Sequence, residues 1–218
     1  MINYTTVRQN MVENQLRPAA ILDARLLQAF QSVPREIFLP KAAAALAYSE
    51  TAQPIGAGRF MLAPLCAAIL LQTAEITAND VVLVIGAGDG YMGAIAARLA
   101  GTVIGVECDA ALLASATAQL NAAGVDNIAL LSAELPAGCP KQAPYDVIIL
   151  NGATQVSIDP LLRQLRQGGR LVCIEYENAV GRARIYRRDG DSFAGRTVRD
   201  CTAPVLPGFE QLPAFSFG

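Results

Sequence analysis

The stretch VVLVIGAGDGYMG, residues 81–93, decides the fold. It opens with five apolar residues, a composition typical of a strand that is buried on both faces. Gly86, Gly88 and Gly90 follow at alternate positions, and the residues after them have the spacing of a helix. Only glycine lets the chain turn sharply and lets a ligand approach the backbone without an intervening Cβ. The stretch therefore predicts a strand, a ligand-binding turn and a helix in direct succession.

The alternation of strands and helices continues downstream of this stretch. Helices are expected at 91–100 and 110–123, and buried strands at 103–106, 128–131, 147–150 and 171–174. Continuous apolar runs are typical of parallel strands that helices cover on both faces. A turn at Asp189-Gly190-Asp191 between two further candidate strands predicts an antiparallel hairpin over about 182–199, at the sheet edge. The fold class is thus α/β, with a doubly wound, mostly parallel sheet of Rossmann-like type.

The region upstream of the sheet is expected to form a helical cap. Residues 4–15 and 21–33 carry apolar positions at helical spacing, and Pro18 and Pro34 stop the two segments. Residues 48–64 are rich in glycine, proline and small side chains, which predicts an extended loop of functional interest before a helix at 65–74. The 218 residues predict a single domain, divided into a cap with its loop (1–75) and the sheet with its hairpin (76–218).

Composition excludes several classes of protein. Hydrophobic residues make up 53% and charged residues 17%, with a net charge of -2, so the chain can bury a large core. It has neither the basic character of a nucleic-acid binder nor the polarity of a disordered chain. The absence of histidine rules out Ser-His-Asp and Cys-His nucleophilic sites, a histidine base and histidine-bound zinc.

Cysteine usage and the hydropathy pattern indicate a cytoplasmic protein that does not enter a membrane. The five cysteines are widely spaced and form no C-x-x-C, so neither a disulfide framework nor a metal site is expected, and we interpret them as reduced core residues. The first 18 residues lack the apolar segment of a signal peptide. Asp89 and Arg98 interrupt the most apolar stretch, so no membrane-spanning run is present.

The glycine turn predicts an adenosyl or nucleotide ligand at the carboxyl edge of the sheet. Glu107 ends the second buried strand, 21 positions after Gly86, close to the ~20 of nucleotide-binding sites, where a carboxylate accepts both ribose hydroxyl protons. The dinucleotide pattern G-x-G-x-x-G fits only in a shifted frame that starts at Gly88, so a nicotinamide oxidoreductase is a weaker alternative. A tight connection without a ligand is the remaining structural interpretation.

Several blocks in order resemble the protein-L-isoaspartate (D-aspartate) O-methyltransferase family of class I S-adenosylmethionine-dependent methyltransferases. These blocks are MVENQLRPAAILDARLLQAFQSVPREIFLP (11–40), QPIGAG with Pro64, the glycine turn, APYDVIIL (143–150) and DPLLRQLRQGGRLV (159–172). The resemblance implies the class I methyltransferase fold and S-adenosylmethionine as cofactor. It also implies methyl transfer to the carboxylate of an isoaspartyl residue in a protein or peptide, or to a related, unidentified acceptor.

The resemblance assigns the site residues position by position. It implies that the glycine turn wraps the cofactor, that Glu107 holds the ribose and that Glu134 and Leu135 lie by the adenine. The expected cofactor-binding residues are Gly86, Ala87, Gly88, Asp89, Gly90, Glu107, Cys108, Glu134 and Leu135. The expected substrate loop contains Gly58, Phe60, Met61 and Leu62. No catalytic residue or metal ligand is assigned, and Asp146 is expected to have a structural role where the fourth strand begins.

Three residues depart from the family pattern. Glu134 stands where the family usually has Asp, and Val84 stands where it commonly has a Glu linked to the methionine end of the cofactor. Leu62 replaces the serine of the family loop Gly-x-Thr-Ile-Ser-Gln-Pro, and its isobutyl group cannot donate a hydrogen bond to a substrate carboxylate. These departures predict weaker cofactor binding and leave three roles for the loop: a degraded isoaspartyl pocket, a pocket rebuilt for another acceptor, or simple packing.

Methyl transfer to a carboxylate needs no general base, because the acceptor is already anionic at neutral pH. The lack of histidine is therefore compatible with this chemistry, which requires chiefly alignment in a pocket that excludes water. A catalytically degraded relative that binds the cofactor or a partner, as a sensor or scaffold, is the alternative to a working enzyme.

Overall fold

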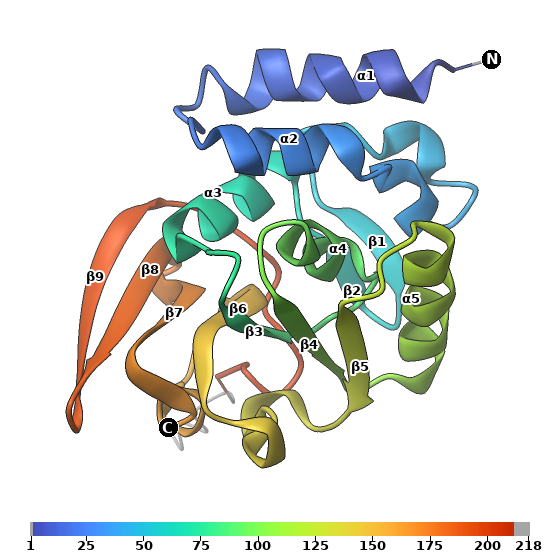
Figure 1. Ribbon diagram of the computed structural model, residues 1–218. Helices are drawn as coiled ribbons and strands as arrows, with labels where there is room; N and C mark the ends of the chain where they lie inside the picture. Colours follow the sequence, from blue (N-terminus) through green and yellow to red (C-terminus); the bar gives the residue numbers. More distant parts are fainter. Residues whose placement is uncertain (1, 212–218) are drawn as a thin grey trace, which may run out of the picture.

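A computed structural model of the protein describes residues 2–211 and contains a seven-stranded mixed sheet (Figure 1). The strand order is β5-β4-β3-β6-β7-β8-β9, in which β3 to β7 are parallel and β8 and β9 are antiparallel. The strands of this sheet are β3 (Val81–Ile85), β4 (Thr102–Glu107), β5 (Ile128–Ser132), β6 (Tyr145–Thr154), β7 (Leu165–Glu177), β8 (Val180–Asp189) and β9 (Ser192–Asp200). The predicted α/β class, parallel sheet and antiparallel edge hairpin are confirmed.

Six α-helices accompany the sheet in the described residues. They are α1 (Tyr4–Met11), α2 (Ala24–Ser32), α3 (Pro64–Ala74), α4 (Tyr91–Ala97), α5 (Ala110–Ala122) and α6 (Asp159–Leu162). A π-helical turn at Val12–Leu16 extends α1, and 3-10 turns lie at Arg35–Phe38, Ala44–Leu46, Leu135–Ala137 and Pro140–Gln142. Helices α1 and α2 are stacked beyond α3 and α4 as the predicted helical cap (Figure 1).

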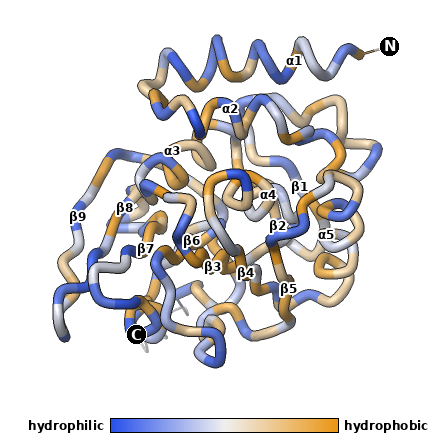
Figure 2. The backbone as a smooth tube through the Cα atoms, in the orientation of Figure 1, coloured by the Kyte–Doolittle hydropathy of each residue, from blue (hydrophilic) through white to orange (hydrophobic). Residues whose placement is uncertain are grey.

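The two faces of the sheet are covered unequally. Because side chains alternate along a strand, Val82 and Val84 join one core cluster while Leu83 and Ile85 join the other. Residues of α1 to α5 pack in the first cluster. The second is closed by α6, the turn at Leu135–Ala137 and residues 205–209. The prediction of helices on both faces is correct for the sheet as a whole, but the second face has only short ones. The central strands form the apolar middle of the molecule (Figure 2).

Residues 48–64 are not simply an extended loop, and that prediction was wrong in part. They contain a two-stranded antiparallel sheet of β1 (Gln53–Gly56) and β2 (Arg59–Met61), which pair only with each other. The turn between them runs through Gly56, Ala57 and Gly58 at φ of 104°, 50° and 68°. Positive φ at three successive positions favours small residues, so the glycines that suggested a loop are the turn of this hairpin.

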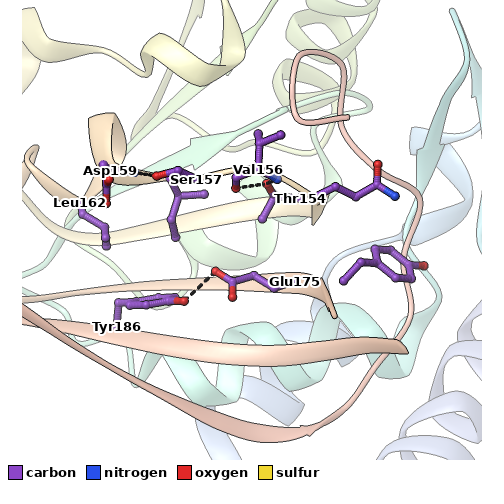
Figure 3. A pocket seen from close by; sticks show the side chains of 10 residues that line it. Thr154, Val156, Ser157, Asp159, Leu162, Glu175 and Tyr186 are labelled. Carbon is purple, nitrogen blue, oxygen red and sulfur yellow. Dashed lines mark hydrogen bonds between the residues drawn. The ribbon is translucent and has the colours of Figure 1, made fainter. Parts of the chain in front are cut away.

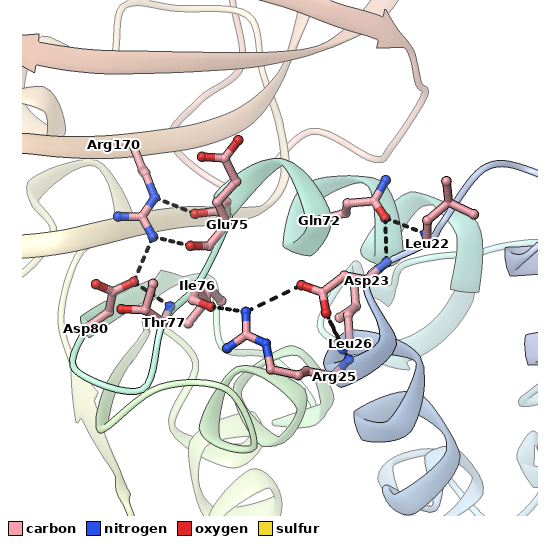
Figure 4. A network of polar contacts seen from close by, with 11 residues as sticks. Leu22, Asp23, Arg25, Leu26, Gln72, Glu75, Ile76, Thr77, Asp80 and Arg170 are labelled. Carbon is pink, nitrogen blue, oxygen red and sulfur yellow. Dashed lines mark hydrogen bonds and ion pairs between the residues drawn. The ribbon is translucent and has the colours of Figure 1, made fainter.

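A polar network at the amino ends of the strands joins the sheet to α3 (Figure 4). The Arg170 guanidinium in β7 donates to the carbonyl oxygens of Ala74 and Glu75 and to Asp80 Oδ2 at 2.7 Å. Asp146 Oδ2 accepts the Val81 N–H at 2.8 Å where β3 and β6 begin, which agrees with the structural role expected of that residue. This network fixes the amino edge, opposite the edge where the glycine turn lies.

From sequence we expected all five cysteines to be core residues, and this prediction was wrong in part. Cys66 and Cys173 are buried, whereas Cys139 and Cys201 are half-buried and Cys108 is exposed. The Cys66 and Cys201 sulfur atoms lie 3.2 Å apart, and all five are free thiols. Among the described residues, no helix is both long and apolar enough to cross a membrane.

Candidate cofactor site

The glycine turn lies at the carboxyl edge of the sheet, where β3 ends, and is held against β4. The N–H groups of Gly86 and Ala87 both donate to the Val106 carbonyl oxygen at 2.9 Å. Gly86, Gly88 and Gly90 have φ of 75°, 54° and 89°, a region that L residues with a side chain rarely adopt. The predicted strand, turn and helix are therefore present, and the turn is fixed in place.

Glu107 ends β4 beside this turn, and its carboxylate is held by the backbone. Its Oε2 accepts the Gly88 N–H at 2.7 Å. Its Oε1 accepts the N–H groups of Cys108 and Asp109 at 2.9 and 3.3 Å. The side chain is fully buried. These donors orient the carboxylate as a ribose-binding residue requires, before any ligand is present.

The Arg59 guanidinium of β2 occupies the free side of this carboxylate. Its Nη1 lies 2.7 and 2.8 Å from the two Glu107 oxygens, and its Nη2 donates to the Gly86 carbonyl at 3.2 Å. Asn151 in β6 donates to the same carbonyl through Nδ2 at 2.9 Å. Arg59 is 4% exposed, so this is a buried ion pair between the hairpin and the sheet.

The remaining space around the turn is almost filled. A Cβ on Gly86 would lie 2.7 Å from Arg59 Nη2 and 2.9 Å from Leu206 Cδ2, and a Cβ on Gly152 would lie 2.6 Å from Leu206. A gap of about 10 Å³ is left, bounded by residues of the hairpin, β6 and the segment 204–206. A single water needs about 10–15 Å³ of such volume, so the gap holds no more than one.

The other predicted cofactor residues are spread around this edge. Ala87 is buried in the turn, and Leu135 is buried beneath the sheet after β5. Cys108 and Glu134 are exposed, at the ends of β4 and β5. The Ala133 N–H donates to the Glu107 carbonyl at 3.2 Å, which brings these two strand ends together. The assigned roles of these residues remain predictions.

Asp89 lines a separate cavity of about 220 Å³, together with Ile55, Leu112 and Gln119. Its Oδ1 accepts the Tyr91 N–H at 2.6 Å, and its Oδ2 has no partner among the described residues. Burial raises the pKa of Asp89 from 3.8 to about 6, against the opposing effect of the Tyr91 N–H. Asp89 therefore belongs to the lining of this cavity and not to the lining of the gap between Arg59 and Leu206.

The expected substrate loop is largely packed. Met61 and Leu62 are 1% and 3% exposed and join the main core, Phe60 is half-buried, and Gly58 is exposed in the hairpin turn. The Leu62 carbonyl accepts a hydrogen bond from Nη2 of the buried Arg35. Leu62 also borders the 10 Å³ gap. Packing and a place at the edge of the site are thus combined in one residue.

A second cavity, of about 340 Å³, lies next to the end of β6 and is also lined by residues of β7 and β8 (Figure 3). Glu175 and Tyr186 point into it, joined by a hydrogen bond of 2.7 Å from the tyrosine hydroxyl. Arg184 Nη1 pairs with Glu175 at 3.0 Å. The charge of the Glu175 carboxylate is therefore already neutralised by Arg184. The sequence did not predict a functional role for this cavity.

Sequence reasoning did not identify Arg59, Asn151 or Leu206 as residues of the site. Arg59 was visible as the variable residue after Gly58, but its partner Glu107 is 48 positions away. Leu206 lies in a segment without helix or strand, which is held by backbone hydrogen bonds of Pro204 and Leu206 with Ala153 and of Phe209 with Gln155. No local periodicity could have placed these side chains.

The fold is shared with solved methyltransferase structures. A protein-L-isoaspartate O-methyltransferase structure superposes with a TM-score of 0.79 at 20% identity, over 92% of this chain and 66% of that one. A Plasmodium falciparum structure titled as such an enzyme in complex with S-adenosyl-L-homocysteine has a TM-score of 0.79 at 16% identity, over 94% and 99%. These similarities establish the class I methyltransferase fold.

Sequence similarity establishes the family. The model of the family "Protein-L-isoaspartate(D-aspartate) O-methyltransferase" matches residues 6–203. A protein of that name from Roseiflexus castenholzii is 34% identical over 94% of this chain and 93% of its own. One from Methanoculleus marisnigri is 39% identical over 76% and 75%. The chain therefore belongs to the protein-L-isoaspartate O-methyltransferase family of S-adenosylmethionine-dependent methyltransferases, which confirms the resemblance.

The side chains as arranged do not fit an adenosyl ligand. The Arg59 guanidinium covers the side of Glu107 that its backbone donors leave free, and Leu206 lies against the glycine turn. The gap of about 10 Å³ between these residues is far smaller than a nucleoside, since small-molecule pockets are usually about 300–1,000 Å³. This arrangement of Arg59 and Leu206 therefore leaves no room for the family cofactor beside Glu107, and we derive no reaction step from it.

Proposed function

We propose that this protein is an S-adenosylmethionine-dependent O-methyltransferase that methylates a carboxylate of an isoaspartyl residue in a protein or peptide. The observation that carries the proposal is the family match over residues 6–203, which includes the hairpin, the glycine turn and Glu107. The names of the relatives, protein-L-isoaspartate O-methyltransferases, support this acceptor.

The chemistry of a carboxylate acceptor suits what this chain offers. Such an acceptor is anionic at neutral pH and needs no base, and the chain has no histidine to supply one. Backbone N–H groups and apolar walls are sufficient for alignment and for exclusion of water. The buried Met61 and Leu62 supply such apolar walls beside the carboxyl edge of the sheet.

The choice of acceptor depends on the substrate loop, in which the family serine is Leu62. A related carboxylate acceptor that needs no hydroxyl donor is the second candidate. A non-catalytic sensor receives no support from the names of the relatives, all of which are those of enzymes.

The test is binding followed by turnover. Calorimetric titration with S-adenosylmethionine and S-adenosylhomocysteine, with NADH as the negative control, checks the cofactor. Transfer of labelled methyl to an isoaspartyl peptide, with the matching aspartyl peptide as control, checks the acceptor. Tight binding of NADH together with no response to either adenosyl ligand at millimolar concentration would refute the methyltransferase assignment. Equal labelling of both peptides would refute only the acceptor.

A further inference from the structure

The β1–β2 hairpin places an arginine where the ribose of the proposed cofactor must bind. We propose that Arg59 is an internal gate: it pairs with Glu107 in the closed protein, and an adenosyl ligand enters only when the hairpin withdraws it. This inference rests on the proposed function and adds regulation of the same site.

The competition is direct, because Arg59 and a ribose use the same acceptor atoms. The Arg59 Nη1 atom donates to both Glu107 oxygens, at 2.7 and 2.8 Å, as the two hydroxyls of a ribose would. The other side of the carboxylate is already taken by the N–H groups of Gly88, Cys108 and Asp109. Glu107 therefore cannot bind both partners.

The carboxylate is prepared for the exchange. When Arg59 leaves, Glu107 keeps its backbone donors and its orientation, so the open site needs no rebuilding on the sheet. Arg59 in turn can be solvated outside the cleft, because a long guanidinium side chain is well accommodated at a surface. The cost of opening is the loss of one buried ion pair and the local packing of the hairpin.

The hairpin is built to move as a unit. Its two strands pair only with each other and not with the seven-stranded sheet. A two-stranded hairpin alone is only marginally stable. The turn residues Gly56 and Gly58 have open space around them within 4 Å of a built Cβ. Ile55 also covers the turn, 3.2 Å from a Cβ on Gly88, so one displacement of the hairpin would uncover Gly88 and Glu107, while Leu206 would stay against Gly86.

Binding of S-adenosylhomocysteine, a probe that does not react, tests the gate in the full chain by calorimetry. Arg59→Ala is expected to bind it about 10- to 100-fold more tightly than the wild type, because apparent affinity scales with the open fraction. Arg59→Gln, which retains a polar side chain, provides a second variant if Arg59→Ala folds poorly. Arg170→Gln is the matched control, since it removes another buried, paired arginine at the opposite edge of the sheet. It is expected to lower the melting temperature and leave the affinity unchanged.

Amide hydrogen exchange supplies a readout that is independent of turnover. On addition of S-adenosylhomocysteine to the wild type, amides of residues 53–61 are expected to exchange faster while those of the glycine turn become protected. A purely structural Arg59 would give no faster exchange in the hairpin.

The outcomes separate the two proposals. Tighter binding by the Arg59 variants, including binding seen only in them, supports the gate. Equal or weaker binding by Arg59→Ala and Arg59→Gln overturns the gate, while binding by the wild type leaves the proposed function standing. No binding by the wild type or by either Arg59 variant refutes both, because removal of the occupant would then have opened no adenosyl site.

Discussion

Replacing Glu107 by glutamine should destabilise the protein far more than replacing its partner Arg59 by methionine. In Glu107→Gln the buried guanidinium loses its counter-charge and one of the two side-chain oxygens that accept from Nη1, while the Gly86 carbonyl still accepts from Nη2 at 3.2 Å. The amide Nε2 of the new side chain would also point a donor at a site that offers donors. Breaking one partner of a buried pair typically costs about 3–5 kcal/mol, and we expect a value in that range.

Arg59→Met leaves the carboxylate in a different situation. Glu107 keeps the Gly88, Cys108 and Asp109 N–H groups, and the methionine side chain fills much of the vacated volume. The expected cost is about 1–3 kcal/mol, as for loss of one partner from a group that stays hydrogen-bonded. The double variant should cost less than the sum of the two, with a coupling of about 0.5–3 kcal/mol.

Urea unfolding followed by circular dichroism at neutral pH measures all four free energies of the cycle, provided that the slopes agree. Unchanged slopes ensure that the variants differ in stability and not in compactness. An Arg59→Met variant that is as unstable as Glu107→Gln, or additive single effects, would refute the idea that the backbone holds this carboxylate without Arg59.

Three further predictions concern buried groups elsewhere in the core. Leu62→Ser should lower the free energy of unfolding by about 2–5 kcal/mol, measured with urea, without increasing isoaspartyl methylation. An increase in methylation of tens of fold at unchanged stability would instead indicate a degraded isoaspartyl pocket. Burial raises the pKa of Asp89 to about 6, so the folded state disfavours the ionised carboxylate. As the pH rises from 4 to 6, the free energy of unfolding of the wild type should fall by up to about 3 kcal/mol relative to that of Asp89→Asn, and parallel stability curves would contradict this. Burial alone would raise the pKa of Asp80, but the Thr77 N–H and Arg170 lower it below its ordinary value. The wild type should lose the stability contributed by this ionised Asp80 only as the pH falls below about 4. Arg170→Met should lack part of that stability already at neutral pH, and equal acid unfolding midpoints for the two proteins would contradict this prediction.

The sheet and the position of the glycine turn and Glu107 at its carboxyl edge were predictable because their signals are local. The apolar run 81–85 is β3 to the residue, and Glu107 is the last residue of β4, as its spacing from the glycines indicated. Alternation along these strands also fixes which side chains enter each core. Sequence pattern is reliable here because hydrogen bonding and burial repeat with the period of the element itself.

What was not predictable depends on contacts between distant segments. The β1–β2 hairpin was hidden because β1 contains Pro54 and Gly56, which usually mark loops, and β2 has only three residues. The pairing of Arg59 with Glu107 and the position of Leu206 follow from how the hairpin and the segment 203–209 fold onto the sheet edge. Neither has a period, so only the assembled structure reveals that the expected cofactor residues face other residues of the same chain.

The departure at Leu62 and the closure by Arg59 belong to one wall of the molecule. Both residues border the same 10 Å³ gap, together with Leu206 from the last described segment. Leu62 is buried there when the hairpin lies against the sheet edge. Burial of its isobutyl group in turn stabilises this closed position of the hairpin, which a hydroxyl group would not do. A serine at position 62 would therefore face the closed hairpin before it could face an acceptor. It follows that the effect of the missing hydroxyl on methyl transfer should be larger in a protein whose Arg59 has been withdrawn from Glu107.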